Sequence, residues 1–303
     1  MEYIIKTENL TKQYGKQTVA DRVGLEVKKG HIYGLIGPNG AGKTTIMRML
    51  AGLTEPDGGE IELFGERKNL DAHRNRISFM IEAPYLDGGM TAEENMTYMG
   101  FVRGVTNKKR RKDLLSFVGL GDVGKKQVDK FSLGMKQRLG IAMALLPSPD
   151  VMVLDEPING LDPEGIVEIR ELLRKLCEEQ GITILISSHI LSELATLCTD
   201  FVIINRGRIL ENLSAEKLRE KCRQYIAIQT DNTEKTAELL RNTWGDSVYM
   251  SASGEEIRVY VSQEEALSVS MAITEGSFVI TKFVTVAEDL EQYYLAKVGG
   301  SHV

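Results

Sequence analysis

The sequence has little that suits a secreted, membrane-spanning or nucleic-acid-binding protein. Its three cysteines, Cys177, Cys198 and Cys222, are odd in number and widely spaced, which favours a reducing compartment over a disulfide framework or a metal cage. No run of about 18 apolar residues occurs, so we expect no transmembrane helix. No basic segment precedes an apolar core near the N-terminus, so we expect no secretory signal. The formal net charge of −6 disfavours a general nucleic-acid binder.

One glycine-rich stretch carries the clearest chemistry. It fits the phosphate-loop pattern and reads Gly37-Pro38-Asn39-Gly40-Ala41-Gly42-Lys43-Thr44. The glycines let the backbone wrap closely around a triphosphate, Lys43 brings a positive charge to the outer phosphates, and the Thr44 hydroxyl suits Mg²⁺. We expect an apolar strand at 31–36, directly before the loop, and a helix that begins at Thr45. This is the order that the motif requires. This context disfavours the alternative, a chance glycine-rich turn.

Two adjacent carboxylates follow an apolar strand expected at 151–154. Unpaired buried charge is costly, so such a pair needs a reason. Beside a phosphate loop, Asp155 is placed to orient the Mg²⁺ shell and Glu156 to accept a proton from attacking water. Another apolar strand, at 182–186, is followed by His189, which on its own would more often be structural. The carboxyl ends of parallel strands share one edge of a sheet, so we expect His189 near the two acids.

Residues 91–146 are expected to be mainly helical. Thr91 and Glu94 fit a capping box at the start of one helix. Ser132 is placed to cap another helix, and Gly134 would let an anion approach that helix N-terminus. The basic run at 108–112 is expected to be a solvated helix face, with anionic lipid head groups as a secondary use.

Together these motifs resemble the ATP-binding subunits of ABC transporters, over about residues 3–218. The resemblance implies an α/β fold, a P-loop ABC ATPase domain with a RecA-like core, an antiparallel β subdomain and an α-helical subdomain. It implies ATP and Mg²⁺ as cofactors, with no further metal. It also implies Glu156, His189 and Lys43 as catalytic residues, His189 being the switch histidine that senses the γ-phosphate.

The resemblance assigns further residues to the nucleotide. Tyr14, which taken alone would be a core or surface residue, matches the aromatic that stacks on adenine. Ser132 and Gly134 match the signature motif, and Asp162 matches the turn that faces a partner subunit. The nucleotide-binding residues implied in this way are Tyr14, Gly37, Pro38, Asn39, Gly40, Ala41, Gly42, Lys43, Thr44, Thr45, Ser132, Gly134 and Asp162.

Two departures from the family pattern matter. The signature normally reads Leu-Ser-Gly-Gly-Gln, whereas this chain has Phe131-Ser132-Leu133-Gly134-Met135; the Ser and the second Gly remain, so phosphate contact should remain too. Glu82 stands where the family normally has Gln after the strand expected at 77–81. Both departures resemble the sequences of the bacitracin- and lantibiotic-resistance branch of the exporters. We expect Glu82, with Thr44 and Asp155, beside the Mg²⁺ site.

The last part of the chain forms a separate domain in our interpretation. The whole chain has 303 residues, enough for two moderate domains. We place these domains at 1–218 and 219–303. The second is expected to run strand, helix, strand, strand, helix, strand and to end in a helix over 287–297, which suggests a small α+β, ferredoxin-like unit. We expect it to pack or to stabilise a dimer; the alternative is a regulatory ligand sensor.

The function implied is an ATPase that powers a separate membrane permease. Two copies would meet head to tail, each ATP lying between one copy's phosphate loop and the other's Ser132 helix. The protein would lie in the cytoplasm, peripheral to the inner face of the cell membrane. The cargo, by branch resemblance, would be a peptide antibiotic or a lipid-linked species. The alternative is a soluble ABC ATPase acting on ribosomes or DNA, which the single phosphate loop and the acidic charge balance disfavour.

Overall fold

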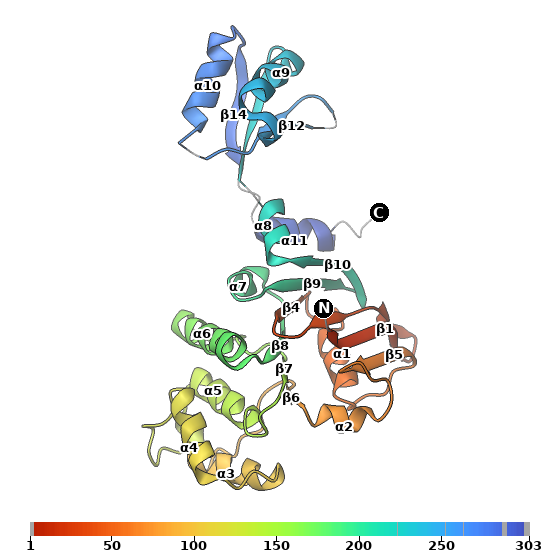
Figure 1. Cartoon of the computed structure of the whole chain (residues 1–303), viewed down its shortest axis with the longest axis vertical. Helices are drawn as coiled ribbons and strands as arrows, with labels where there is room; N and C mark the ends of the chain where they lie inside the picture. Colours follow the sequence, from red (N-terminus) through yellow and green to blue (C-terminus); the bar gives the residue numbers. More distant parts are fainter. Residues whose placement is uncertain (1–2, 223, 252, 263, 287–289, 300–303) are drawn as a thin grey trace. The chain divides into compact units, whose positions relative to one another are not determined.

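The computed structural model describes residues 3–222, 224–251, 253–262, 264–286 and 290–299 (Figure 1). It divides the chain into two compact units, Met1–Ala215 and Glu216–Val303. The domain boundary proposed after residue 218 falls inside helix α8 (Ala215–Lys221), next to this division.

A six-stranded sheet forms the centre of the first unit. Five neighbouring strands are parallel, and β10 joins one edge in the antiparallel sense. The spatial order is β10 (Arg208–Ser214), β9 (Asp200–Asn205), β4 (Ile32–Ile36), β8 (Thr183–Ser188), β7 (Val151–Leu154) and β6 (Ile77–Met80). Strands β4, β7 and β8 are buried along their whole length, as expected for parallel strands with both faces covered.

An antiparallel sheet and helix α1 (Lys43–Leu50) share a core with one face of the central sheet. The sheet has the order β2-β1-β3, with β5 also paired to β1; the strands are β1 (Tyr3–Tyr14), β2 (Gln17–Val23), β3 (Glu26–Lys28) and β5 (Gly58–Leu63). Helix α1 begins at Lys43 rather than at Thr45, because Gly42 adopts the left-handed conformation at its N-cap. Its buried side chains Ile46, Met47, Met49 and Leu50 join the two sheets.

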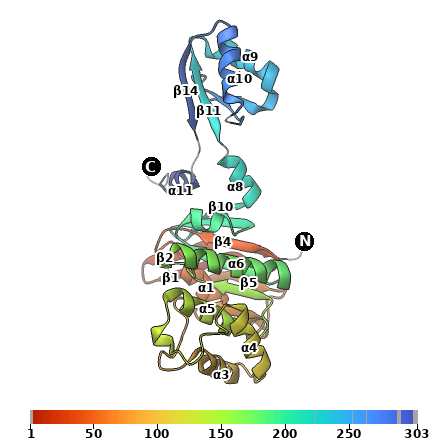
Figure 2. The ribbon, with the colours of Figure 1, turned by 90° about the vertical axis from the view of Figure 1, so that its left-hand side faces the viewer.

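The helical region lies at the β6 edge of the central sheet, where its helix α5 (Leu133–Ala144) packs against β6. It comprises α3 (Ala92–Val102), α4 (Lys108–Phe117), the short 3-10 turn η1 (Val128–Lys130) and α5, which lie together in both views (Figures 1 and 2). The capping box is confirmed: the Thr91 side chain accepts from the Glu94 backbone, and the Glu94 side chain accepts from the Thr91 backbone. Ser132 caps α5, as predicted, by accepting from the Met135 N–H at 3.2 Å.

The basic run forms α4, and its two arginines, Arg110 and Arg111, differ from the expected solvated face, since both are partly buried. Lys108, Lys109 and Lys112 are exposed. Arg110, in contrast, donates to the carbonyl oxygens of Leu145 and Leu146 at 2.7 and 2.8 Å. It satisfies acceptors that the C-terminus of α5 leaves without helical partners.

Three further helices complete the first unit: α2 (Leu70–Arg74), α6 (Pro163–Gln180) and α7 (Leu191–Ala195). In α6 the residues Ile169, Leu172, Leu173 and Leu176 are buried, which gives the helix an apolar face with helical spacing. None of the helices in the described ranges has a stretch long and apolar enough to cross a membrane.

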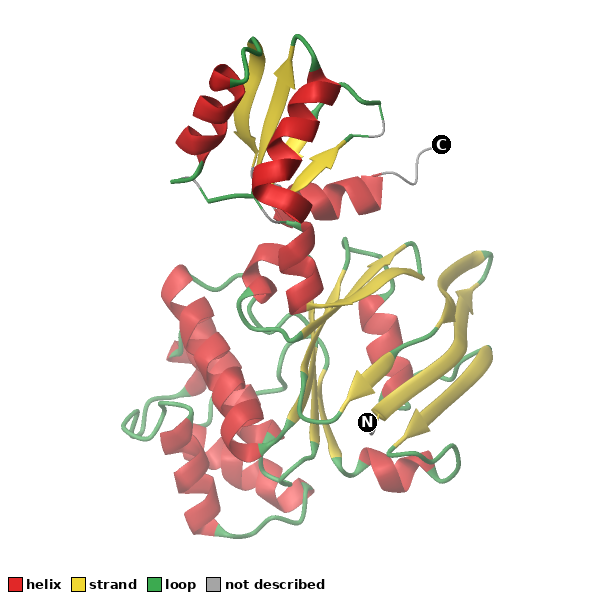
Figure 3. Cartoon of the chain, turned by 45° about the horizontal axis from the view of Figure 1, so that its top comes forward, coloured by secondary structure: helices red, strands yellow, loops and turns green. Residues whose placement is uncertain are grey.

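The second unit is a sheet covered by helices, seen as two layers in Figures 2 and 3. Its elements are β11 (Tyr225–Thr230), α9 (Thr233–Trp244), the 3-10 turn η2 (Gly245–Ser247), β12 (Val248–Met250), β13 (Ile257–Val259), α10 (Ala266–Glu275), β14 (Ile280–Val286) and α11 (Leu290–Gly299). The sheet is antiparallel with the order β12-β13-β11-β14. We interpret this topology as ferredoxin-like. The expected start of the last helix at 287 lies outside the described residues.

Candidate active site

The phosphate loop joins β4 to α1, and two of its glycines are required by their surroundings. A Cβ on Gly37 would lie 2.3 Å from the carbonyl oxygen of Ile204, and one on Gly42 would lie 2.3 Å from that of Val19. Gly42 also has φ 106°, a conformation that other residues rarely adopt. The loop residues Pro38, Asn39, Gly40 and Ala41 lie between β4 and the helix, and Thr45 lies in the first turn of α1. The chain can therefore make this turn only with glycine at both positions.

Lys43, Glu156 and His189 come together, although they are far apart in the sequence. The Lys43 ammonium donates to the Gly37 carbonyl at 2.7 Å and lies 3.1 Å from a Glu156 oxygen. The other Glu156 oxygen is 2.9 Å from His189 Nδ1. The lysine is buried, and the acid and the imidazole are partly accessible. The structure thus brings all three predicted catalytic residues to one end of the parallel sheet.

Asp155 is buried and has two hydroxyl partners. The Thr44 Oγ1 donates to one carboxylate oxygen at 2.7 Å, and the Ser187 Oγ donates to the other at 2.6 Å. A hydroxyl and a carboxylate side by side are ligands that Mg²⁺ accepts, and Mg²⁺ commonly binds through one or two protein oxygens together with water and substrate phosphates. The described residues contain no cluster of three or more His, Cys, Asp or Glu suited to a metal ion. Thr44 and Asp155 therefore fit a nucleotide-linked Mg²⁺ better than a closed protein cage.

Glu82 follows β6 and is engaged by a neighbour of the phosphate loop. Its exposed carboxylate forms an ion pair with Arg48, one helical turn beyond Thr44 on α1. The carbonyl of Met80, two residues earlier, accepts from the Asp155 N–H at 2.8 Å. Glu82 is thus linked to the Mg²⁺-binding candidates through the backbone of β6 and through α1. Its own placement as a metal-site residue stays a prediction.

The remaining predicted nucleotide residues lie outside the phosphate loop, on β1 and at the starts of α5 and α6. Tyr14 ends β1 with its ring half exposed, and the Lys12 ammonium is 5.6 Å from the ring centroid. Ser132 caps α5, and Asp162 caps α6 by accepting from the Gly165 N–H at 3.0 Å. A Cβ on Gly134 would lie 3.9 Å from the Leu161 side chain, so the starts of α5 and of the turn before α6 are neighbours.

The sequence-based prediction missed two contributors. Ser187 is not among the predicted site residues, yet its hydroxyl donates to Asp155 and also accepts from the Glu156 N–H at 2.8 Å. Glu193 lies one turn after His189; burial raises the pKa of its carboxyl, His189 opposes this shift, and Glu156 adds to it. A hydroxyl at the end of a strand beside two acids was the available signal for Ser187.

Two acids near the site have unusual backbones. Glu156 has φ 49° and Glu82 has φ 65°, the left-handed region that non-glycine residues seldom occupy. Each follows a strand of the central sheet, Glu156 after β7 and Glu82 after β6. Such conformations cost about 1–3 kcal/mol each and persist where surrounding contacts impose them.

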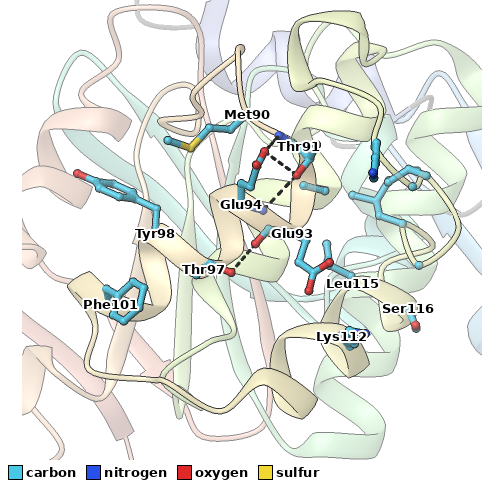
Figure 4. A pocket seen from close by; sticks show the side chains of 16 residues that line it. Met90, Thr91, Glu93, Glu94, Thr97, Tyr98, Phe101, Lys112, Leu115 and Ser116 are labelled. Carbon is cyan, nitrogen blue, oxygen red and sulfur yellow. Dashed lines mark hydrogen bonds between the residues drawn. The ribbon is translucent and has the colours of Figure 1, made fainter.

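A large cavity lies elsewhere in the first unit. It has a volume of about 1050 Å³ and is bounded by α3, α4 and the segment 120–125, with Tyr98, Phe101 and Lys112 on its wall (Figure 4). None of the predicted nucleotide, catalytic or metal residues lines it. We assign the nucleotide chemistry to the loop and the sheet edge, where the hydrogen-bonding groups converge, rather than to this cavity.

Comparison with known proteins places the chain among transporter ATPases. The ABC transporter family model matches residues 20–159. The chain is 41% identical, over its full length and that of the relative, to the bacitracin transport ATP-binding protein BcrA of Bacillus licheniformis. It is 45% identical, over 75% of this chain and 99% of the relative, to the lantibiotic transport ATP-binding protein SrtF of Streptococcus pyogenes.

Solved structures agree with this placement. The ATP-binding subunit of an ABC transporter superposes with a TM-score of 0.63 at 31% identity, covering 72% of this chain and 92% of that one. A dimeric ATP-binding cassette bound to ADP and phosphate superposes with a TM-score of 0.62 at 25% identity, covering 70% and 98%. The predicted P-loop ABC ATPase fold is confirmed.

Replacing Glu156 with Gln should retain ATP binding and remove turnover. The amide keeps the shape of the side chain but is a poor proton acceptor, so kcat should fall about 10²–10⁴-fold. ATP should then hold a long-lived dimer that elutes earlier from a gel-filtration column. Steady-state ATPase assays and gel filtration with ATP provide the measurements. Turnover at the parent rate would remove Glu156 from the catalytic role.

Replacing Tyr14 with Ala should weaken nucleotide binding more than it slows the chemical step. A ring stacked on adenine contributes equally to the ground and transition states, so KM should rise while kcat stays nearly constant. Tyr14→Phe keeps the stacking surface and is the matched control. If KM for ATP is unchanged in Tyr14→Ala, the ring is only a packing residue.

Proposed function

This chain belongs to the ATP-binding proteins of ABC transporters, and on that basis we propose that it powers a separate permease acting on a peptide antibiotic. The observation that carries the ATPase assignment is the convergence of Lys43, Glu156 and His189 beside the glycine loop. The cargo class is supported by the full-length similarity to a bacitracin transport protein. We place the protein in the cytoplasm, on the inner face of the cell membrane beside the permease.

Hydrolysis would proceed by in-line attack of water on the γ-phosphate. In this proposal Glu156 takes the proton of the attacking water. His189 Nδ1 lies 2.9 Å from Glu156 Oε2, so His189 would position that carboxylate. His189 would also contact the γ-phosphate. Lys43 and the loop N–H groups stabilise the charge that develops on the phosphate oxygens. Thr44 and Asp155 would hold Mg²⁺, which when bound neutralises charge on the phosphates.

We propose that the complete site needs a second copy. In the described residues, no hydrogen bond or ion pair links Ser132 to the loop at 37–44. Its hydroxyl accepts from the Met135 N–H and its carbonyl from the Lys136 N–H, both in the helix that it caps. Ser132 is exposed, so the N-terminus of α5 is available to a nucleotide bound by another chain. A head-to-tail pair would place each ATP between one copy's loop and the other's α5.

The permease is proposed to dock on the helical region, around the cavity of Figure 4. Exposed apolar side chains gather toward the end of α3, where Tyr98, Phe101 and Val102 are 53%, 71% and 62% exposed. Such clusters on a soluble surface are typical of sites that bind another protein. Tyr98 and Phe101 line the cavity wall in Figure 4.

The transporter assignment predicts the outcome of affinity purification. Tagged full-length chain, purified from detergent-solubilised membranes of its natural host, should bring with it a protein with several membrane spans. Mass spectrometry would identify the partner and thereby narrow the cargo. Recovery of ribosomes or DNA without any membrane protein would refute the transporter role and support the soluble alternative.

Tyr98→Asp should abolish this co-purification, because it leaves an unpaired charge in an apolar contact. The ATPase activity of the isolated chain should stay within about twofold of the parent. Tyr249→Asp is a matched control, since Tyr249 is also a tyrosine with 53% exposure but lies on β12 in the other unit. Equal loss of the permease in both variants would argue against docking at α3.

Glu82 is proposed to couple the nucleotide state to the permease. It is tied to α1 through Arg48 and precedes the segment that leads to α3. In Glu82→Gln, which removes the charge at nearly constant size, the isolated subunit should hydrolyse ATP within a few-fold of the parent. The assembled transporter should lose most of its transport or resistance while still assembling. Arg48→Gln should behave in the same way if the ion pair transmits the signal.

Two results would contradict this role of Glu82. A fall in isolated ATPase activity as large as in Glu156→Gln would make Glu82 a direct catalytic residue. Transport at the parent level in Glu82→Gln would leave it as a structural residue only. Assays of the isolated subunit and of the reconstituted transporter, run on the same variants, separate these cases.

A further inference from the structure

The second unit has an open strand edge and several exposed apolar side chains. The large apolar residues exposed in the described part of this unit are Tyr249, Leu267, Met271, Val279, Val284 and Leu295. Four of the six belong to α10, to β14 or to the turn between them. Leu267 and Met271 lie on the side of α10 away from the buried Val269 and Ile273, whereas Val284 lies on β14 itself. In a unit with its own packed core, an exposed apolar residue on an edge strand indicates a contact surface.

Strand β14 ends the sheet and pairs with β11 on one side only. Its seven residues are Ile280-Thr281-Lys282-Phe283-Val284-Thr285-Val286, five of them β-branched, and none of them is fully buried. The opposite end of the sheet is β12, with three residues, and short edge strands pair poorly. Along residues 280–286, no described residue occupies the outer backbone edge. The long edge is therefore the one suited to accept another strand.

Two features that commonly protect an edge are present but leave part of it open. Lys282 is the only charged residue of β14, and its ammonium is held 2.8 Å from Glu256, the residue before β13. The pairing with β11 carries one extra residue at Thr281, because Gln229 faces Lys282 while Thr230 faces Ile280. Such a bulge disrupts regular pairing locally. Five regularly paired residues remain, 282–286.

We propose that β14 of a second copy pairs with this edge in the antiparallel sense, centred on Val284, and joins two four-stranded sheets into one. In that register Val284 meets Val284, Phe283 faces Thr285, and Lys282 faces Val286. No like charges oppose each other, and β-branched and aromatic residues form the facing pairs, which stabilise sheets. A strand that pairs with its own copy around a two-fold axis is self-complementary.

The second copy is the favoured occupant because the proposed ATPase pair already brings it. The proposal goes beyond that function, since the β14 contact needs no nucleotide. A pair of five-residue strands covers less than the roughly 1,200–2,000 Å² of a stable interface, so it should be weak alone. Linked to the ATPase units, it would keep two copies near each other and raise their effective concentration for ATP-driven closure.

The test uses full-length protein without nucleotide, so that closure of the ATPase units does not contribute. Sedimentation velocity over a range of concentrations should show a reversible monomer–dimer equilibrium for the parent chain. V284K and V284E each place like charges face to face on the two-fold axis and should each weaken the dimer about fivefold or more. An equimolar mixture of V284K and V284E should restore the dimer, because opposite charges then face each other.

Cross-linking checks the location. In a Cys222→Ser background, V284C should form a disulfide-linked dimer, whereas Y249C, at the opposite edge of the sheet, should not. Cys177 and Cys198 are buried and do not interfere. Parent chain that is monomeric at all concentrations, a V284K and V284E mixture that stays monomeric, or equal cross-linking of Y249C would each overturn the proposal.

ATPase activity separates this proposal from the function proposed above. Val284 has no part in the catalytic machinery, so V284K and V284E should retain the parent kcat at saturating ATP. Absence of ATPase activity in the parent would refute the proposed function without affecting the nucleotide-free dimer. Loss of the dimer in V284K with normal ATPase activity, and its return in the mixture, would support the β14 contact specifically.

Discussion

The buried carboxylate of Asp155 is the constraint on which the first unit depends most. A charge removed from water costs several kcal/mol unless its oxygens are paired. Here Thr44 from α1 and Ser187 from β8 donate to the two oxygens, and the Asp155 N–H donates to Met80 of β6. One residue at the end of β7 therefore fixes three other elements. Any shift of α1 away from the sheet would leave one oxygen of this buried carboxylate without its partner, so the phosphate loop and the catalytic edge are held together.

The same edge contains strain that this network can hold. Glu156 has a left-handed backbone, yet its N–H donates to Ser187 and its carboxylate lies between Lys43 and His189. Ser187 thus serves both acids, donating to Asp155 and accepting from the residue after it. A single hydroxyl has one donor and two acceptor positions, so both contacts are compatible. The contacts around Glu156 offset the free-energy cost of its left-handed backbone. They also hold its carboxylate beside Lys43 and His189, where the γ-phosphate is proposed to lie.

Much of the fold and of the site followed from local signals. The phosphate loop, the apolar strands before Asp155 and His189, and the caps at Thr91 and Ser132 all depend on residues close in sequence, and they were predictable. The ion pair of Glu82 with Arg48, the dual role of Ser187 and the contact of Arg110 with α5 join segments that are distant in sequence. The periodicity of apolar residues along the sequence does not predict such long-range contacts. The start of α1 at Lys43 was missed because it depends on the left-handed Gly42.

The two helix caps that resemble partner-facing motifs illustrate how a cap can also bind a ligand. Ser132 accepts from the Met135 N–H, which uses a lone pair of its hydroxyl and leaves the O–H proton free to donate. A phosphate oxygen at the N-terminus of α5 would accept a hydrogen bond from that O–H, and the helix dipole favours its negative charge. The cap therefore orients the donor before the nucleotide arrives. Asp162 differs, because its carboxylate accepts only and already caps α6. It would repel a phosphate, so in the proposed dimer Asp162 is better suited to accept hydrogen bonds from the partner's backbone than to contact the nucleotide directly.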